Sequence, residues 1–345
     1  MINRIDNIAN LNKEELAELI AGYSEEEYEY ATKKARELMR ERFGGRIYVR
    51  GLIEYSNHCK NDCLYCGIRC SNRNVTRYRL TKEEIMTCCE SGYECGIRTF
   101  VLQGGEDAYF TDEVLCDIVA SIHKEYPDCA ITLSAGERSY ESYERLHKAG
   151  ADRYLLRHET ADKEHYGKLH PALMSYDNRM ECLRNLKKIG YQTGCGMMIG
   201  SPYQTAEHLA EDILFMKELK PEMIGIGPFL PHSGTPFSEE EPGSVRLTLF
   251  MISLIRLIAP DALIPSTTAL GSAKAGGRIM GIMAGANVIM PNLSPEDNRD
   301  KYLLYDKKAS LKDGAKQVIS DFDEVLKKSG FSIYVGRGDF SENEE

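Results

Sequence analysis

The sequence predicts a parallel (β/α)8 barrel, and three observations lead to that fold class. Short apolar segments alternate with helical segments from about residue 46 to residue 292. Several of these segments are continuously apolar, which is typical of parallel strands covered on both faces. Glycines also stand where helices should end before the next strand, at Gly150, Gly190 and Gly285. An open doubly wound sheet is the alternative architecture.

The elements can be placed one by one from their composition. We expect eight strands, at residues 46–55, 99–103, 130–134, 153–157, 192–199, 223–228, 263–266 and 287–291. We expect two helices within residues 11–43, one after a capping box at Thr81 to Glu84, and others at 111–126, 139–149, 175–190, 205–219, 244–259 and 273–284. No Pro-, Gly- or Ser-rich linker divides the chain. The expectation is therefore one domain over 1–345, with N-terminal helices (11–43), a barrel (46–292) and a C-terminal extension (293–345).

Composition excludes several classes of function. The chain has 345 residues and a net charge of −10, which argues against a nucleic-acid surface. No apolar run approaches the length of a membrane span, and the N-terminus lacks an apolar signal segment. The eleven cysteines, three of them clustered, fit a reducing cytoplasm better than a secreted disulfide scaffold.

The most informative motif is a loop with the spacing CxxxCxxC, formed by Cys59, Cys63 and Cys66 directly after the first predicted strand. Three thiolates can hold three irons of a 4Fe–4S cube and leave the fourth iron open. A structural zinc site is the alternative, and it would need a fourth ligand such as Cys70 or His58. Tyr65 places an aromatic ring between the last two cysteines. The loop resembles the signature of the radical SAM superfamily, in which the open iron binds S-adenosylmethionine (SAM).

Polar residues follow several predicted strands, at the end of a barrel where chemistry gathers. Gln103, Gly104, Gly105 and Glu106 resemble the glycine-rich segment that holds the methionine amino group of SAM, although a plain turn has the same composition. Arg157 and Glu159 alternate on one strand, so both can face the mouth, or form only a structural ion pair.

Other strand ends offer further ligands. A carboxylate such as Glu159 suits a ribose diol, and the guanidinium of Arg179 suits a carboxylate. Met197 and Met198 can pack against adenine or belong to the core. The hydroxyls of Thr267 and Thr268 can line a polar pocket or cap the next turn.

Longer strings carry a closer resemblance. The chain resembles the HydE family, radical SAM maturases of the diiron hydrogenase active site, in the strings SNHC (56–59), CLYCGIR (63–69), RYR (77–79), VLQGGED (101–107), GADRYLLRHET (150–160), GIGPF (225–229) and ANVIMPN (286–292). These strings run over almost the whole chain and are far more specific than the cysteine signature.

The resemblance implies roles for particular residues. The cluster ligands would be Cys59, Cys63 and Cys66. Residues implied to bind SAM are Tyr65, Gln103, Gly104, Gly105, Glu106, Ser134, Glu159, Arg179 and Met198. Residues implied to line the substrate cavity are Thr132, Arg153, Arg157, Thr267, Thr268, Tyr302 and Tyr305.

The resemblance also implies cofactors, a substrate and partners. The cofactors would be one 4Fe–4S cluster and SAM. The substrate would be an iron–cysteine complex carrying carbon monoxide and cyanide, supplied by the maturase HydG. Transient contacts with HydG- and HydF-type maturases and a reductant protein are expected. No cysteine lies beyond Cys195, so a second C-terminal cluster of the kind some HydE proteins carry has no thiolate ligands here.

Three alternatives remain at this point. Methylornithine synthase is a related radical SAM enzyme with the same single-cluster barrel. A biotin-synthase-like enzyme would need a second cluster deep in the barrel, for which only Cys129 and Cys195 are available. A non-enzymatic metal sensor or scaffold would use the three cysteines structurally, but it leaves the polar strand ends unexplained.

Overall fold

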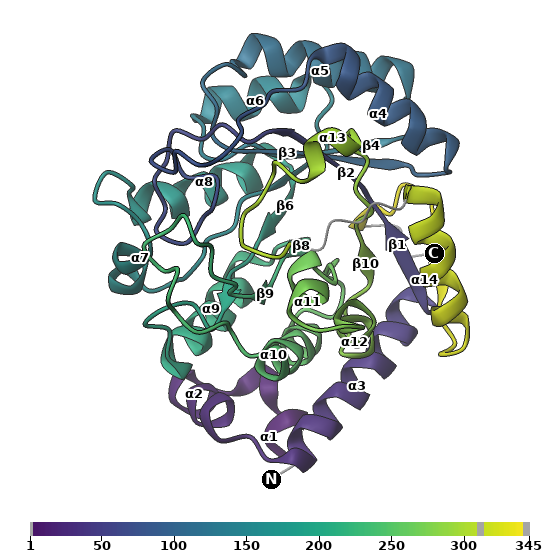
Figure 1. Ribbon diagram of the computed structural model, residues 1–345. Helices are drawn as coiled ribbons and strands as arrows, with labels where there is room; N and C mark the ends of the chain where they lie inside the picture. Colours follow the sequence, from purple (N-terminus) through teal and green to yellow (C-terminus); the bar gives the residue numbers. More distant parts are fainter. Residues whose placement is uncertain (1–2, 309–313, 341–345) are drawn as a thin grey trace.

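Parallel strands form the wall of a barrel in the computed structural model, which describes residues 3–308 and 314–340 (Figure 1). A six-stranded parallel sheet runs in the order β2-β3-β4-β5-β6-β8. Its strands are β2 (Gly51–Ser56), β3 (Thr99–Gly104), β4 (Ala130–Ser134), β5 (Arg153–Leu155), β6 (Gln192–Cys195) and β8 (Met223–Ile224).

Further parallel pairings carry the wall from β8 back to β2. Met223 bridges Leu263, and Pro265 bridges Val288 of β10 (Val288–Ile289). Strand β10 pairs with β1 (Arg46–Val49), and Asn292, just after β10, bridges Leu52 of β2. The predicted fold class, a (β/α)8-type barrel, is therefore confirmed.

Several predicted strands are interrupted. Residues 46–55 divide at Arg50 into β1 and β2. Residues 192–199 and 223–228 each divide in two, because β7 (Met198–Ile199) and β9 (Gly227–Pro228) pair separately. Gly196 marks one break with φ of +154°, and a Cβ there would lie 2.0 Å from the carbonyl oxygen of Gly225. Glycine is thus needed where the wall bends. Residues 263–266 contribute only single bridges.

Helices cover the outside of the wall. They are α4 (Lys82–Glu94), α5 (Asp112–Glu125), α6 (Tyr140–Lys148), α7 (Lys163–Leu169), α8 (Tyr176–Ile189), α9 (Ala206–Leu219), α10 (Val245–Ile258), α11 (Thr268–Ala273) and α12 (Gly277–Met283). The helix predicted at 273–284 is in fact α11 and α12, because Gly276 turns with φ of +73° and a Cβ on Gly277 would lie 2.1 Å from the Leu270 carbonyl. Helix α7 was not expected from the sequence.

The N-terminal helices lie below the barrel in Figure 1. They are α1 (Asn3–Asp6), η1 (Ile8–Asn10), α2 (Lys13–Gly22) and α3 (Glu25–Phe43). Asn12 and Ser24 begin α2 and α3 with complete capping boxes. Helix α2 packs on α9, and α3 packs on α10.

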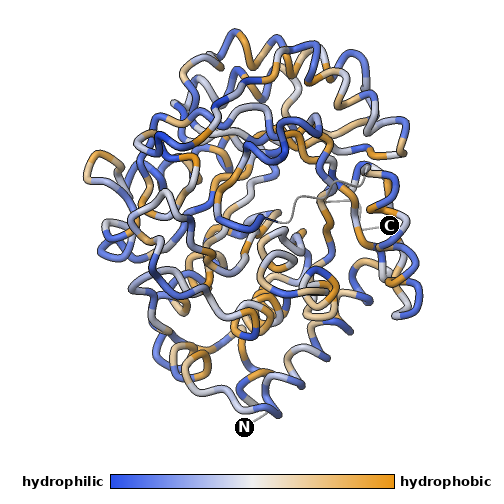
Figure 2. The backbone as a smooth tube through the Cα atoms, viewed as in Figure 1, coloured by the Kyte–Doolittle hydropathy of each residue, from blue (hydrophilic) through white to orange (hydrophobic). Residues whose placement is uncertain are grey.

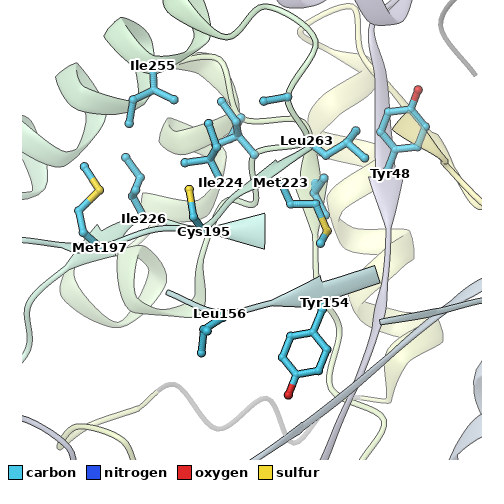
Figure 3. Close-up of a cluster of buried hydrophobic side chains, with 14 of the residues drawn as sticks. Tyr48, Tyr154, Leu156, Cys195, Met197, Met223, Ile224, Ile226, Ile255 and Leu263 are labelled. Carbon is cyan, nitrogen blue, oxygen red and sulfur yellow. The ribbon is translucent and has the colours of Figure 1, made fainter. Parts of the chain in front are cut away.

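The apolar residues form a continuous core. Hydrophilic stretches mark the outer helices, whereas apolar stretches lie toward the interior (Figure 2). Figure 3 shows side chains from the barrel wall, such as Met197, Ile224 and Ile226, together with Ile255 of α10, which packs from outside. None of the described helices combines the length and apolar character that crossing a bilayer requires.

The C-terminal extension is more ordered than the sequence suggests. It contains α13 (Glu296–Arg299), α14 (Ala315–Lys327) and β11 (Ser332–Tyr334), and β11 pairs in parallel with β1. Residues 337–339 then reach the start of β5. There Arg153, fully buried, donates to the Asp339 carboxylate at 2.7 Å and to the carbonyls of Arg337 and Gly338.

This placement argues against the substrate contact expected for Arg153. Its remaining nitrogens donate to Gln192 and Thr99, so every nitrogen of the guanidinium is engaged by protein. It lies at the amino end of β5, away from the carboxyl ends where the cysteine loop begins. Its place at the first position of the strand already indicates the base of the barrel, whereas its partners in the C-terminal segment are not evident from the sequence.

We expect Asp339→Asn to destabilise the protein by about 2 kcal/mol, because it removes the charge that compensates a buried guanidinium. Burial opposes ionisation of Asp339, but Arg153 outweighs it and holds its pKa below the usual 3.8. A depressed carboxyl pKa stabilises above the unfolded-state value and is lost as the pH falls through the folded-state value. The difference between the proteins should therefore be constant from pH 5 to 8 and shrink below about pH 4.

Urea unfolding at several pH values measures this difference. Asp323→Asn is the matched control, because Asp323 forms a surface pair with Lys327 one turn along α14. It should change stability by no more than about 0.5 kcal/mol. Equal effects of the two substitutions would contradict the role assigned to Asp339.

Candidate functional site

The cysteine loop, residues 57–79, leaves the carboxyl end of β2 and returns to it. An antiparallel bridge between Ser56 and Arg79 closes its neck. Inside the loop, Arg77 donates to the carbonyl oxygens of Asn57, Ile68, Arg69 and Asn72. A single guanidinium thus holds together a segment that has almost no regular secondary structure of its own.

The three predicted cluster ligands lie together in this loop. Cys59, Cys63 and Cys66 are partly buried free thiols. Burial raises the pKa of all three, and their mutual repulsion adds to the effect for Cys63 and Cys66; the pKa of Cys66 reaches about 12. Without a cation the thiols would therefore stay protonated, whereas bound iron favours the thiolate form. The donors fit an iron–sulfur cluster.

The zinc alternative would require a fourth ligand beside the three cysteines, whereas the thiolates of a cube each bind a different iron. Cys70, one of the two imagined fourth ligands, is exposed.

The glycine-rich segment after β3 lies against the cysteine loop. A Cβ on Gly105 would lie 2.2 Å from the carbonyl oxygen of His58 and 2.7 Å from the Cβ of Cys59. Only glycine permits this approach. Glu106 is held by the backbone N–H of Glu137 at 3.0 Å and by Lys60 at 3.2 Å. A pocket of about 220 Å³ opens beside Glu106.

Tyr65 is held by residues that the sequence did not single out. Its hydroxyl lies 3.2 Å from Nε2 of His170, whose Nδ1 lies 3.0 Å from the Tyr166 carbonyl oxygen. A carbonyl accepts only, so Nδ1 carries the proton and Tyr65 donates to Nε2. Burial lowers the pKa of His170 to about 3, so the ring stays neutral. The Tyr166 ring stacks on His170 with centroids 3.9 Å apart, and its buried hydroxyl has no partner.

The charged residues predicted to bind SAM and substrate lie close together at the mouth of the barrel. Arg157 Nη2 lies 3.1 Å from Glu159 Oε2, although the geometry is not that of a hydrogen bond and both atoms keep unused capacity. Arg179 donates to Glu137 at 2.5 Å and to the Arg157 carbonyl at 2.6 Å. Burial disfavours its charge, but Tyr166 and Glu137 hold its pKa above the usual value.

Glu159 has an unusual backbone. Its φ is +65°, in the left-handed region that a glutamate rarely adopts. Its N–H donates to the carbonyl of Gly196 at 3.0 Å, and the neighbouring His158 accepts from the Gly196 N–H. The tertiary structure therefore determines where the Glu159 carboxylate lies.

The two methionines considered for adenine lie in different clusters, and Ser134 lies at a strand end. Met198 belongs to a small buried cluster with Leu169, Phe229 and Phe237, against which Leu64 and Tyr65 pack. Met197 is fully buried in the main core. Ser134 ends β4 beside Gln103, its partner in the strand register.

The residues expected to contact substrate divide into groups. Thr132 and Thr267 have buried hydroxyl oxygens without a partner, as a ligand-binding surface requires. Gln103 donates to the buried hydroxyl of Tyr302 at 3.3 Å. Burial raises the pKa of Tyr305 to about 12, so this hydroxyl stays protonated at neutral pH. Thr268 begins α11.

The sequence did not predict a buried ion pair that lies at the mouth of the barrel. Glu54 of β2 is almost fully buried, accepts from Lys308 at 2.5 Å, and accepts from Asn292 at 2.9 Å. Lys308 lies beyond the predicted barrel, so no sequence rule connects it to Glu54. Glu137, in contrast, follows Gly136 at the end of β4 and could have been found by examining every strand end.

Comparisons with known proteins agree with this site. The family model of the radical SAM superfamily matches residues 53–216. The chain is 48% identical over 273 residues to the [FeFe] hydrogenase maturase subunit HydE of Thermotoga maritima, covering 79% of this chain and 78% of that protein. It is 30% identical over 320 residues to 3-methylornithine synthase of Methanosarcina acetivorans, covering 92% and 88%.

Solved structures give the same fold. Methylornithine synthase (PylB) superposes with a TM-score of 0.84 at 28% identity, covering 96% of this chain and 97% of that one. The hydrogenase maturase HydG superposes with a TM-score of 0.80 at 22% identity, covering 97% and 75%.

Together the fold, the cysteine loop and the matched model define a radical SAM enzyme, with a 4Fe–4S cluster and SAM as its cofactors. Within that superfamily the chain belongs to the HydE family, which its 48% identity to a curated member shows. When bound, the cluster supplies one electron that splits SAM into methionine and an adenosyl radical. The protein's part is to hold the reactants and exclude water.

We expect reconstituted protein to contain about four irons per chain, the content of one cube. Replacing Cys59, Cys63 and Cys66 together by Ala should abolish iron binding and SAM cleavage, while circular dichroism stays unchanged. Cys70→Ala is the control and should keep all the iron. Four irons in the triple variant, or a reproducible content near eight in the wild type, would refute the assignment.

Proposed function

We propose that the protein performs the HydE step in assembly of the diiron hydrogenase active site. In this proposal the adenosyl radical acts on an iron–cysteine complex carrying carbon monoxide and cyanide, supplied by a HydG-type maturase. The single observation that carries the proposal is the 48% identity to a HydE protein over 273 residues. The work would take place in a reducing cytoplasm, consistent with eleven free cysteines.

In this proposal, different residues hold the cluster and SAM. Cys59, Cys63 and Cys66 would hold the cluster. The residues that would hold SAM are Tyr65, Gln103, Gly104, Gly105, Glu106, Ser134, Glu159, Arg179 and Met198. Support comes from the free hydrogen-bonding capacity of Glu159 and from the close approach of Gly105 to the cysteine loop.

Substrate would lie deeper in the barrel, against Thr132, Arg157, Thr267, Thr268, Tyr302 and Tyr305. Arg157 supports this placement because two of its nitrogens have no hydrogen-bond partner, which favours an anionic or cyanide-bearing ligand. Arg153 is left out because protein groups engage all its nitrogens.

Methylornithine synthase activity is the second candidate, and the 28% identity and TM-score of 0.84 to that enzyme favour it. A biotin-synthase-like reaction has less support. Cys129 and Cys195 are both fully buried among the apolar residues of the core.

Maturation of an apo-hydrogenase tests the proposed function. The protein, HydG and HydF are incubated with SAM, dithionite and apo-hydrogenase, and hydrogen evolution is measured. Activity should require this protein and fail with its triple cysteine variant. A parallel incubation with lysine and SAM should yield no methylornithine; that product without hydrogenase activity would select the second candidate.

Arg157→Met should reduce maturation more than SAM binding. Because Arg157 is about one-third exposed, we expect a loss of about 2 kcal/mol, the low end for breaking a charged pair with a ligand. That corresponds to about a 30-fold lower kcat/KM.

The measurements are maturation rate and SAM affinity, compared with Arg145→Met, a surface control on α6. If Arg157→Met weakened SAM binding but matured hydrogenase normally at saturating SAM, Arg157 would belong to the cofactor site.

A further inference from the structure

The cysteine loop concentrates positive charge in an acidic protein. Between residues 57 and 79 it carries five basic residues and one acidic residue, a net charge of +4 (5 − 1), whereas the whole chain carries −10. This contrast calls for an explanation, because like charges crowded into one short loop repel one another.

Two of the five basic residues bind groups within the loop itself. Arg69 is buried and pairs with Asp62, the single acidic residue of the loop, at 2.6 Å. Arg77 binds backbone carbonyls inside the loop. The other three, Lys60, Arg73 and Arg79, are exposed.

The ion pairs that two of these residues form leave their positive charge on the surface. The Lys60 side chain is 63% exposed, while its partner Glu106 is 10% exposed. Arg79 is 37% exposed, while its partner Asp107 is 3% exposed. In both pairs the cation therefore faces solvent and the carboxylate lies beneath. Arg73 makes no ion pair within the described part of the chain.

An exposed aromatic ring lies beside one of these cations. Tyr109 is 58% exposed, and the guanidinium of Arg79 lies 5.1 Å from the centre of its ring. Lys60 is close to both, because its partner Glu106 is the chain neighbour of Asp107, the partner of Arg79. Aromatic and arginine side chains together are the usual energetic anchors of protein interfaces. We call Lys60, Arg79 and Tyr109, together with the exposed Arg73 elsewhere on the same loop, the cluster-side face.

Another part of the loop has different surroundings. Leu64 and Tyr65 of the loop pack against a small cluster that includes Phe237, and the exposed Tyr203 contacts Phe237 with ring centroids 6.2 Å apart. Phe237 is followed by three exposed glutamates at 239–241, which would repel an acidic partner. Charge complementarity thus distinguishes the basic part of the loop from the part that lies near these glutamates.

We propose that the cluster-side face is the docking surface for a small acidic iron–sulfur electron carrier of the ferredoxin type. Each SAM cleavage consumes one electron, and electron transfer weakens steeply with distance, so the donor must approach the cluster closely. Lys60 directly follows the cluster ligand Cys59 in the chain. One electron leaves the reduced carrier and enters the cluster; no bond is made or broken in this step.

The test compares carrier-driven with carrier-independent reduction. Holoenzyme is mixed with a reduced acidic 2[4Fe–4S] ferredoxin, and the cluster reduction rate and the ferredoxin dissociation constant are measured at low and high salt. Dithionite, a small reductant that needs no docking surface, drives SAM cleavage in a separate assay. Carbodiimide coupling, which joins lysines to carboxylates, is mapped by mass spectrometry.

Arg73→Glu should slow reduction by ferredoxin about tenfold at low salt, with a smaller difference at high salt, because the effect acts through charge steering. Binding should weaken in parallel, and Lys60 should be a site of coupling to ferredoxin. Dithionite-driven SAM cleavage should not change. Lys33→Glu, with the same charge change on the 66% exposed Lys33 of α3, should alter the rate by less than about twofold.

An uncharged second variant makes the test independent of the loop's folding. Tyr109→Ser lies outside the cysteine loop and should also weaken ferredoxin binding while preserving iron content. An unchanged ferredoxin rate in both variants would overturn the proposal. So would an equal loss in Lys33→Glu, or a loss of hydrogenase maturation with normal ferredoxin reduction, which would assign the face to a maturase partner. None of these readouts except the last depends on the proposed substrate.

Discussion

The rest of the site depends on three thiols held close together in a place that disfavours negative charge. Burial raises the pKa of Cys59, Cys63 and Cys66, and repulsion from neighbouring cysteines adds to it for Cys63 and Cys66, so the loop alone does not stabilise three thiolates. Only a bound cationic centre makes the ionised state favourable there. The loop would therefore need the cluster to hold three thiolates. The neighbouring elements serve mainly to hold the loop in a fixed position on the barrel.

The barrel fixes the position of the cysteine loop through backbone contacts more than through side chains. Gly105 brings the end of β3 against His58 and Cys59, and Gly196, just after β6, accepts a hydrogen bond from the N–H of Glu159, whose backbone is left-handed. The guanidinium groups of Arg77 and Arg69 bind the loop to itself. A catalytic loop with little regular structure is positioned in this way by a rigid scaffold.

The two ends of the barrel differ in how their polar groups are satisfied. At the base, every nitrogen of Arg153 has a protein partner, and the C-terminal segment covers it. Toward the mouth, Arg157 and Thr267 retain buried polar atoms without partners, and Thr132, deeper in the barrel and level with Arg153, does so too. Unsatisfied buried groups are costly unless a ligand completes them, so those of Arg157 and Thr267 mark the mouth as a place where a ligand is expected.

The sequence by itself determined the fold class, and it drew attention to the three cysteines and the polar residues at the strand ends as candidate ligands. These follow from local patterns: alternation of strand and helix, cysteine spacing, and glycines before polar residues. It did not reveal that Arg153 is structural, that His170 holds Tyr65, or that Lys308 neutralises Glu54. Those contacts join segments 105 to 254 residues apart in the chain. Only the closed barrel decides them, because closure sets which distant side chains share a buried space.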